Sequence, residues 1–199
     1  MARNTFTTAL LAGAVALAVL PSVNADMASA KMLADTCAGC HGTDGASKGP
    51  ASPSIAGISA AYFEEIMKGF AAGSVPSTIM GRIAKGYSED EIKAMAKHFS
   101  GLKFAAASQK VNAEQAQEGA KLHDKYCEKC HANGGTSAED DAGILRGQWA
   151  PYVKWSLADY TSGKREPTKK MKAQLEKLME KEGDKGIEAL LQFYASSGK

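Results

Sequence analysis

Cys37-Ala-Gly-Cys40-His41 and Cys127-Glu-Lys-Cys130-His131 are two copies of one pattern, C-x-x-C-H, placed ninety residues apart in a chain of 199 residues. Two thiols at this spacing reach the two vinyl groups of one porphyrin and form thioethers, and the adjacent histidine is then held beneath the iron. The sequence therefore predicts two covalently bound haem c groups, each with a histidine as proximal iron ligand. The expected haem-binding residues of the two motifs are Cys37, Cys40, His41, Cys127, Cys130 and His131.

Other uses of the four cysteines fit the sequence less well. Four cysteines in an exported protein would ordinarily suggest two disulfides, and two C-x-x-C pairs can bind zinc. A redox-active C-x-x-C would need a βαβ setting, but no segment keeps the alternating pattern of a strand for long. Because each pair is followed by a histidine and opens a separate copy of a repeat, haem attachment is the favoured interpretation, with zinc as the alternative.

The likeness between the two halves extends beyond the motifs. Gly57 and Tyr62 correspond to Gly147 and Tyr152 at the same offset of ninety residues. A repeat of this length is typical of two homologous domains, and domains this small need a bound cofactor to complete their cores. The expected division is a signal peptide over residues 1–25, a first domain over 26–104 and a second domain over 105–199.

A methionine follows each motif at a similar distance. Met80 lies 39 residues after His41, and Met171 lies 40 residues after His131. Met80 falls in an irregular segment between two expected helices, where a thioether can reach across a haem face, and Met171 is its counterpart in the repeat. We expect these two methionines to be the distal iron ligands, which raises the reduction potential and leaves no open iron position. Met179 is the alternative in the second half.

The remaining methionines and histidines have simpler expected roles. Met67 and Met95 lie on apolar helix faces and are expected to fill the core. His98 and His123 are expected to be surface or packing residues, and ligation of each iron by two histidines is the alternative.

The pattern of apolar residues is helical in both halves. Helices are expected to begin at the N-capping residues Ser59, Ser88 and Asp184. The second of these, with Glu91 three residues later, has the pattern of a capping box. The Gly- and Ser-rich segments 42–57 and 132–147 are expected loops. In the first loop the carbonyl of Pro53 is the expected acceptor for the second ring nitrogen of His41.

The first 25 residues have the pattern of a cleaved signal peptide. Arg3 gives a positive start, residues 10–20 are an apolar core, and Val23-Asn24-Ala25 offers small residues for cleavage. This core is shorter than the ~20 residues of a membrane span, and an uncleaved amphipathic anchor is the alternative. The chain has 24 Lys and Arg against 22 Asp and Glu, which argues against a nucleic-acid partner. We expect a periplasmic protein with no membrane span.

The repeat as a whole resembles the dihaem cytochromes c4. This resemblance implies an all-α fold of two tandem class I cytochrome c domains related by a pseudo-twofold axis, with Met80 and Met171 as distal ligands. Three segments are more similar to the cytochrome subunit of flavocytochrome c sulfide dehydrogenase, namely Ala51–Ile55, Ser77–Ser88 and Gly119–His131.

The second resemblance implies a heterodimer with a flavoprotein subunit that carries covalently bound FAD and oxidises sulfide to sulfur or polysulfide. The present chain would not be an enzyme on its own. It would take single electrons from that flavin and pass them to a soluble cytochrome. A permanent partner needs an apolar interface patch, for which the candidates are Phe104, Trp149, Tyr152 and Trp155.

Two other functions fit the haem motifs. A free-standing shuttle of the cytochrome c4 type would feed a terminal oxidase and have a polar surface without a stable partner. A dihaem peroxidase would need an open or labile iron position, whereas each half of this chain offers a methionine to fill it.

Overall fold

A computed structural model describes residues 27–138 and 142–196, and within these ranges the chain is helical with no strand. The expected signal peptide, residues 1–25, lies outside the described residues. None of the described helices is long and apolar enough to cross a membrane.

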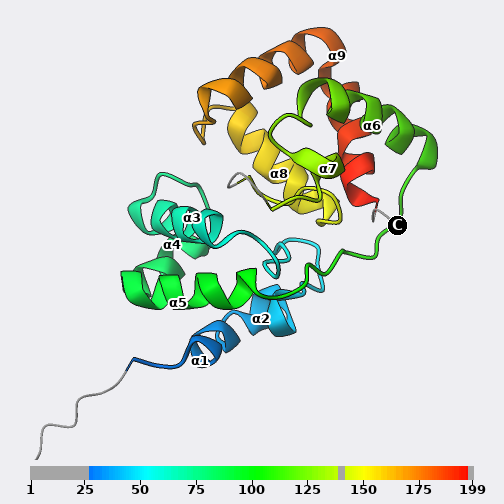
Figure 1. Cartoon of the computed structure of the whole chain (residues 1–199). Helices are drawn as coiled ribbons and strands as arrows, with labels where there is room; N and C mark the ends of the chain where they lie inside the picture. Colours follow the sequence, from blue (N-terminus) through cyan, green and yellow to red (C-terminus); the bar gives the residue numbers. More distant parts are fainter. Residues whose placement is uncertain (1–26, 139–141, 197–199) are drawn as a thin grey trace, which may run out of the picture.

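The helices form two lobes that follow each other along the chain (Figure 1). The first lobe contains α1 (Ala30–Asp35), α2 (Ala38–His41), α3 (Ala60–Ala72), α4 (Met80–Ile83) and α5 (Glu89–Ser100), with short 3₁₀ turns at Thr43–Gly45 and Ala84–Gly86. The second lobe contains α6 (Ala113–Tyr126), α7 (Ala132–Gly135), α8 (Ala150–Thr161) and α9 (Lys169–Ala195).

Two of the expected helix starts are confirmed. The Ser59 hydroxyl accepts a hydrogen bond from the backbone N–H of Tyr62 at 3.0 Å and so caps α3. At α5, Ser88 and Glu91 form the predicted capping box: the Glu91 carboxylate accepts from the Ser88 N–H at 2.8 Å, and the Ser88 hydroxyl accepts from the Glu91 N–H at 3.3 Å. Each cap satisfies N–H groups that have no partner inside the helix.

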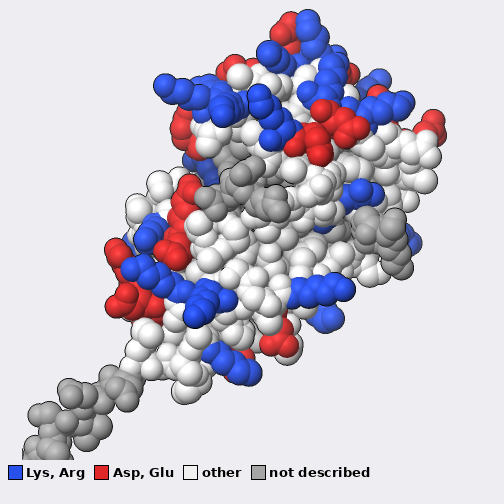
Figure 2. Space-filling model, viewed as in Figure 1, with Lys and Arg blue, Asp and Glu red and all other residues white. Residues whose placement is uncertain are grey.

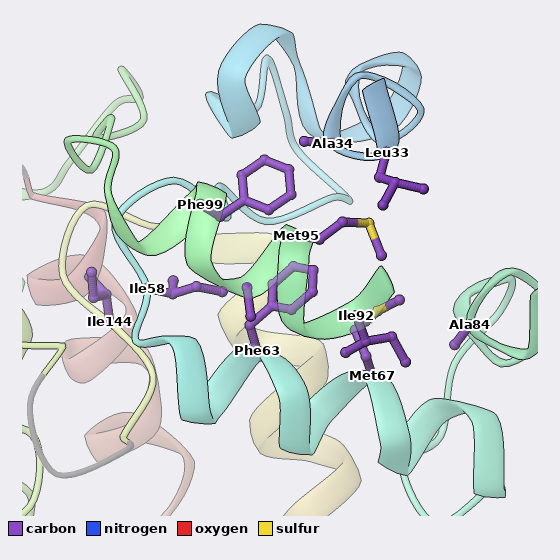
Figure 3. Packing of buried hydrophobic residues seen from close by; sticks show 11 residues of the cluster. Leu33, Ala34, Ile58, Phe63, Met67, Ala84, Ile92, Met95, Phe99 and Ile144 are labelled. Atoms are coloured by element: carbon purple, nitrogen blue, oxygen red, sulfur yellow. The ribbon is translucent and has the colours of Figure 1, made fainter. Parts of the chain in front are cut away.

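The core of the first lobe lies between α1, α3 and α5 (Figure 3). Phe63 of α3 stacks on Phe99 of α5 with ring centroids 5.5 Å apart. Met67 and Met95 are 5% and 0% exposed, so both fill the core as expected. Ile144, from the second lobe, is buried in the same cluster. The two lobes therefore share part of their apolar interior.

The core of the second lobe forms where α6 crosses α9. Leu122 and Tyr126 of α6 are buried against Leu190 and Tyr194 of α9. Gly119 makes this close crossing possible, because a Cβ at that position would overlap the carbonyl of Ala189.

The structure differs from two expectations about the helices. Met80 was expected in an irregular segment but begins the one-turn helix α4. The last helix was expected to begin at Asp184, whereas α9 begins at Lys169, because the Thr168 side chain caps it. The helix is interrupted just before Asp184, at Gly183, where φ is +59°, a conformation that glycine adopts without steric cost.

Polar contacts join the lobes as well as apolar ones. The Gln148 side chain accepts from the backbone N–H of Ser54 at 3.0 Å and donates to the carbonyl of the same residue at 2.7 Å. Trp149 donates to the carbonyl of Ser47 at 3.3 Å, and its ring lies against Gly49, where a Cβ would clash with the indole. These contacts link parts of the chain about a hundred residues apart and fix how the two lobes meet.

Candidate functional site

The first C-x-x-C-H motif forms a single helical turn. Cys37 precedes α2, and its carbonyl accepts from the backbone N–H groups of Cys40 at 3.2 Å and His41 at 2.9 Å. All four cysteines of the chain are free thiols. Burial raises the pKa of the half-buried Cys37 thiol, whereas Cys40 is exposed. One turn therefore presents two thiols and an imidazole together.

The ring of His41 is oriented by the loop that follows it. Its Nδ1–H donates to the carbonyl of Pro53 at 2.8 Å, which confirms the expected partner. Because a carbonyl only accepts, the proton lies on Nδ1, and Nε2 keeps a free lone pair that can bind a metal. Burial lowers the pKa of His41, against a smaller opposite effect of the Pro53 hydrogen bond. The ring is thus held neutral, the form that binds iron.

The second motif repeats this geometry. The carbonyl of Cys127 accepts from the backbone N–H of His131 at 3.0 Å, and His131 Nδ1–H donates to the carbonyl of Gly143 at 3.2 Å. Burial is the main cause that lowers the pKa of His131. The hydrogen bond is longer than that of His41, in line with a carbonyl that belongs to glycine and not to the rigid Pro53.

The loops behind the two motifs are also built alike. The carbonyl of Gly45 accepts from the N–H groups of the two residues after Ser54, and the carbonyl of Gly135 accepts from those of Leu145 and Arg146. The N–H groups of Gly57 and Gly147 then bond to the carbonyls of Phe99 and Tyr194, at 2.8 and 2.7 Å. The sequence repeat is therefore also a repeat of hydrogen bonds.

The expected distal ligands both lie at the start of a helix. Met80 begins α4 and packs against the core of the first lobe, partly buried. Met171 lies in the first turn of α9, where its N–H donates to the Thr168 hydroxyl at 3.3 Å, and it too is partly buried. Their role as iron ligands stays a prediction, as does the alternative Met179.

The residues present fit a covalently bound haem better than a bare metal ion. Two free thiols, an imidazole with Nε2 available and a partly buried thioether are the donor set of a c-type haem. By contrast, the described part of the chain contains no group of three or more His, Cys, Asp or Glu side chains placed to hold a metal ion.

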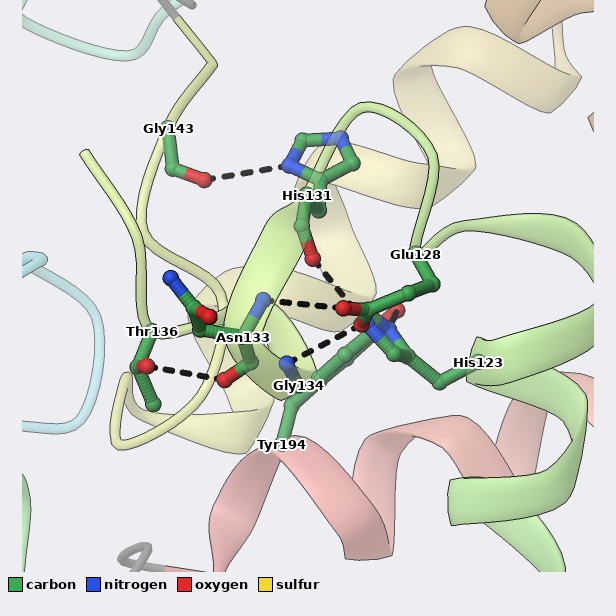
Figure 4. Close-up of polar contacts among 8 residues, drawn as sticks. All are labelled: His123, Glu128, His131, Asn133, Gly134, Thr136, Gly143 and Tyr194. Carbon is green, nitrogen blue, oxygen red and sulfur yellow. Dashed lines mark hydrogen bonds and ion pairs between the residues drawn. The ribbon is translucent and has the colours of Figure 1, made fainter. Parts of the chain in front are cut away.

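One polar cluster at the second motif was missed by the sequence reasoning (Figure 4). His123 is fully buried, and it bonds to Tyr194, to Glu128 and to the carbonyl of His131. The pKa of Glu128 is lowered: partial burial opposes this, but hydrogen bonds from Gly134 and His123 outweigh it. A comparison of the two copies of the repeat could have found this cluster. At the offset of ninety residues, His123 and Glu128 of the second copy replace the apolar Leu33 and Ala38 of the first.

Comparison with known proteins gives the family of this chain. The profile of the family described as cytochrome c matches residues 27–103. The cytochrome subunit of sulfide dehydrogenase from Chlorobaculum tepidum is 49% identical over 72 residues, which cover 36% of this chain and 64% of that protein, slightly under two thirds of its length. Cytochrome c4 from Azotobacter vinelandii is 32% identical over 156 residues, covering 70% of this chain and 74% of the relative.

A solved structure extends the match to most of the chain. The crystal structure of reduced recombinant cytochrome c4 from Pseudomonas stutzeri superimposes with a TM-score of 0.70 at 25% identity, covering 85% of this chain and 98% of that one. The expected all-α fold of two tandem class I cytochrome c domains is thereby confirmed. The domain boundary between residues 104 and 105 stays a prediction.

Two C-x-x-C-H turns, each with its histidine anchored to a carbonyl twelve residues later, define a c-type cytochrome. The 32% identity to cytochrome c4, over 74% of that relative, then gives the family. The chain belongs to the dihaem cytochrome c4 family. Its cofactor is covalently attached haem c, two groups per chain, and its function is electron transfer.

Proposed function

We propose that this chain is the electron-accepting cytochrome subunit of a sulfide-oxidising complex, paired as a heterodimer with a flavoprotein that carries FAD. The observation that carries the proposal is the 49% identity to a cytochrome subunit of sulfide dehydrogenase. That value is well above the 32% found for cytochrome c4, although it extends over a shorter segment.

The proposed haem sites follow the two motifs. Cys37 and Cys40 attach the first haem, with His41 and Met80 as its iron ligands. The corresponding residues of the second haem are Cys127, Cys130, His131 and Met171. Haem bound in this way supplies reversible one-electron transfer between ferric and ferrous iron. The carbonyls of Pro53 and Gly143 orient the two imidazoles, and burial keeps both rings neutral.

The number of haems suits a flavin donor. Oxidation of HS⁻ to sulfur releases one proton and two electrons, and a flavin receives these electrons as a pair. Two ferric haems on one chain take one electron each, which returns the flavin to its oxidised form. A soluble cytochrome then accepts the electrons one at a time and so restores both ferric haems.

The surface offers one candidate contact for the flavoprotein. Of the four aromatic residues considered from the sequence, Trp149, Tyr152 and Phe104 are partly buried by contacts within the chain, whereas Trp155 on α8 is 53% exposed. We expect Trp155 to lie in the heterodimer interface, since exposed tryptophans are enriched at binding surfaces. Export to the periplasm, by cleavage after Ala25, belongs to the same proposal.

Purification of the native protein from the periplasm tests the partnership. A flavin spectrum and a second, larger chain at fixed stoichiometry are expected, together with reduction of both haems on addition of sulfide. The variant Trp155→Ala should recover less flavoprotein, while Val111→Ala, also at an exposed apolar position, should recover the normal amount. A single two-haem chain without flavin would contradict the proposal.

A second candidate function is supported by the extent of the cytochrome c4 match. The Azotobacter vinelandii relative aligns over both halves of the chain, and the solved cytochrome c4 is covered over 98% of its length. A free-standing shuttle to a terminal oxidase would be purified without flavin. It would be reduced by a respiratory donor and not by a sulfide-treated flavoprotein.

A further inference from the structure

The two haem sites of this chain are built alike in their backbone but differ in what lies behind them. In the first lobe the residues behind the motif are apolar: Leu33 and Phe99 are 6% and 1% exposed, and Ala38 follows the first cysteine. At the corresponding positions the second lobe has a histidine, a tyrosine and a glutamate, namely His123, Tyr194 and Glu128. We call these three residues the polar network.

The polar network is fully hydrogen-bonded. His123 Nδ1 lies 2.9 Å from the Tyr194 hydroxyl, and its Nε2 lies 2.8 Å from a Glu128 carboxylate oxygen. A carboxylate only accepts, so the proton is on Nε2 and the tyrosine hydroxyl donates to Nδ1. His123 is 0% exposed, and a buried polar side chain with every polar atom paired fixes its neighbours in one arrangement.

The network acts directly on the backbone of the proposed axial ligand. His123 Nε2 also lies 3.1 Å from the carbonyl of His131. The two Glu128 oxygens accept from the N–H groups of Asn133 at 2.9 Å and Gly134 at 3.0 Å. Both of these residues have a positive φ, of 56° and 66°, so the carboxylate holds a turn that Asn133 adopts less readily than glycine does.

We propose that His123, Glu128 and Tyr194 are positioning residues of the second haem site, which fix the peptide of His131 and lower the reduction potential of that haem alone. A carboxylate beside the ligand's peptide favours ferric iron, which carries one more positive charge than ferrous iron. Hydrogen bonding around the axial ligand is one of the means by which a protein tunes a haem. The first haem has an alanine in place of this carboxylate, so the network makes the two haems unequal.

This inference rests on His131 as an axial ligand, and not on the flavoprotein partner. The test uses the full dihaem chain and a redox titration followed by NMR, in which the haem-methyl resonances report each haem separately. The variant Glu128→Gln keeps the shape of the side chain but removes its charge. Its matched control is Glu118→Gln, an exposed carboxylate of α6, shortly before Glu128 in the chain, that pairs with Lys121.

Glu128→Gln is expected to shift the potential of the second haem upward and leave that of the first haem unchanged, while Glu118→Gln changes neither. Tyr194→Phe, which introduces the residue of the first copy, is expected to move the proton resonances of the second haem and its axial histidine only. Unchanged potentials in Glu128→Gln, or equal shifts of both haems, would overturn the proposal.

Haem counting by mass spectrometry on the same samples separates the possible failures. Two haems with an unshifted second potential would mean that the network is only structural. One haem in the wild-type chain would refute the assignment of His131 and with it the inference. Purification without a flavoprotein would refute the proposed complex but leave the inference intact.

Discussion

A thioether and an imidazole stabilise the two oxidation states of haem iron differently, which makes the distal ligands testable one residue at a time. Methionine favours ferrous iron and raises the potential. Met80→His is therefore expected to keep the first haem attached and lower its potential, with the second haem unaffected. Spectroelectrochemistry on the dihaem chain measures this, with Met67→Leu, a change in the buried core, as the control. An unchanged potential would show that another residue is the ligand.

Haem attachment at the second motif is tested by removing its thiols. Cys127→Ala combined with Cys130→Ala is expected to give a chain with one haem, because the remaining imidazole of His131 holds the porphyrin only non-covalently. Mass spectrometry of the denatured protein counts the attached haems. Two attached haems in this variant would exclude the second motif as an attachment site. The corresponding variant of Cys37 and Cys40 is the matched control and is also expected to carry one haem.

At this scale the sequence defined the two motifs, whose role in haem attachment stays a prediction, and it predicted the residues around them only in part. The motif carries its own chemistry, so Cys37 to His41 needed no tertiary information, and Pro53 was correctly expected to anchor His41. His123 was expected to be an ordinary surface or packing residue. Its burial and its link to the His131 carbonyl depend on where α9 places Tyr194, seventy-one residues later. A local sequence pattern does not predict a contact between residues so far apart in the chain.

Among the helices, the capping box of α5 makes a prediction about pH. The pKa of Glu91 is lowered because its carboxylate accepts hydrogen bonds from the backbone N–H and hydroxyl of Ser88. A lowered pKa means that the stabilisation is complete above the ordinary value of 4.5 and is lost as the pH falls through the lower native value. The melting temperatures of wild type and Glu91→Ala should therefore differ at neutral pH and converge in acid.

The control for this experiment is Glu89→Ala, on the same exposed first turn of α5. Glu89 has no part in the capping box, so its removal affects only the interaction with the helix dipole, which is small at an exposed site. A difference between wild type and Glu91→Ala that does not shrink below pH 4.5 would show that the carboxylate acts through something other than the cap.

Helices were predictable where a capping residue stands directly before an apolar stripe, as at Ser59 and Ser88. They were misjudged where a helix is polar on most sides. The first half of α9 is highly charged, so its start at Lys169 gave no clear stripe, and only the cap by Thr168 marks it. The one-turn helix α4 is too short to leave any periodic signal in the sequence.

For the whole molecule, the pairing of Gln148 with Ser54 predicts how strongly the lobes depend on each other. Gln148 is 3% exposed and satisfies both backbone groups of Ser54 across the interface. Gln148→Leu leaves a buried N–H and a buried carbonyl unpaired, at a cost of about 2 kcal/mol or more. Calorimetry should show a lower melting temperature and the loss of a single joint transition. The surface variant Gln117→Leu is the control, and equal melting of both variants would contradict the expectation.

The arrangement of the lobes could not be predicted from the sequence in this detail. The repeat implied two similar domains, but Ser54 and Gln148 are 94 residues apart and neither carries a motif. Trp149 was considered as a contact for a partner protein, whereas in the structure it packs on Gly49 of the first lobe. Such contacts depend on the shapes of two folded surfaces, which a one-dimensional pattern does not contain.

The segments around the two proposed distal ligands, Met80 and Met171, differ in charge. This difference predicts where an anionic electron acceptor reacts. The segment before and around Met171 carries five basic residues and a single acid, Glu166, whereas the corresponding segment 74–81 of the first copy has no charged residue. The five are Lys164, Arg165, Lys169, Lys170 and Lys172. Lys and Arg side chains gather over this part of α9 in Figure 2.

Oxidation of the reduced protein by ferricyanide, a multiply charged anion, should therefore slow as ionic strength rises, because salt screens the attraction over a Debye length of ~8 Å at 0.15 M. Lys169→Gln with Lys170→Gln should lower the rate at low salt severalfold and flatten its salt dependence. The control is Lys93→Gln with Lys97→Gln on α5, which removes the same total charge from the first lobe. Stopped-flow absorbance at several salt concentrations measures both. If the two double variants lost the same slope, net charge alone would steer the oxidant, and the basic segment beside the second haem would have no special part in electron exit.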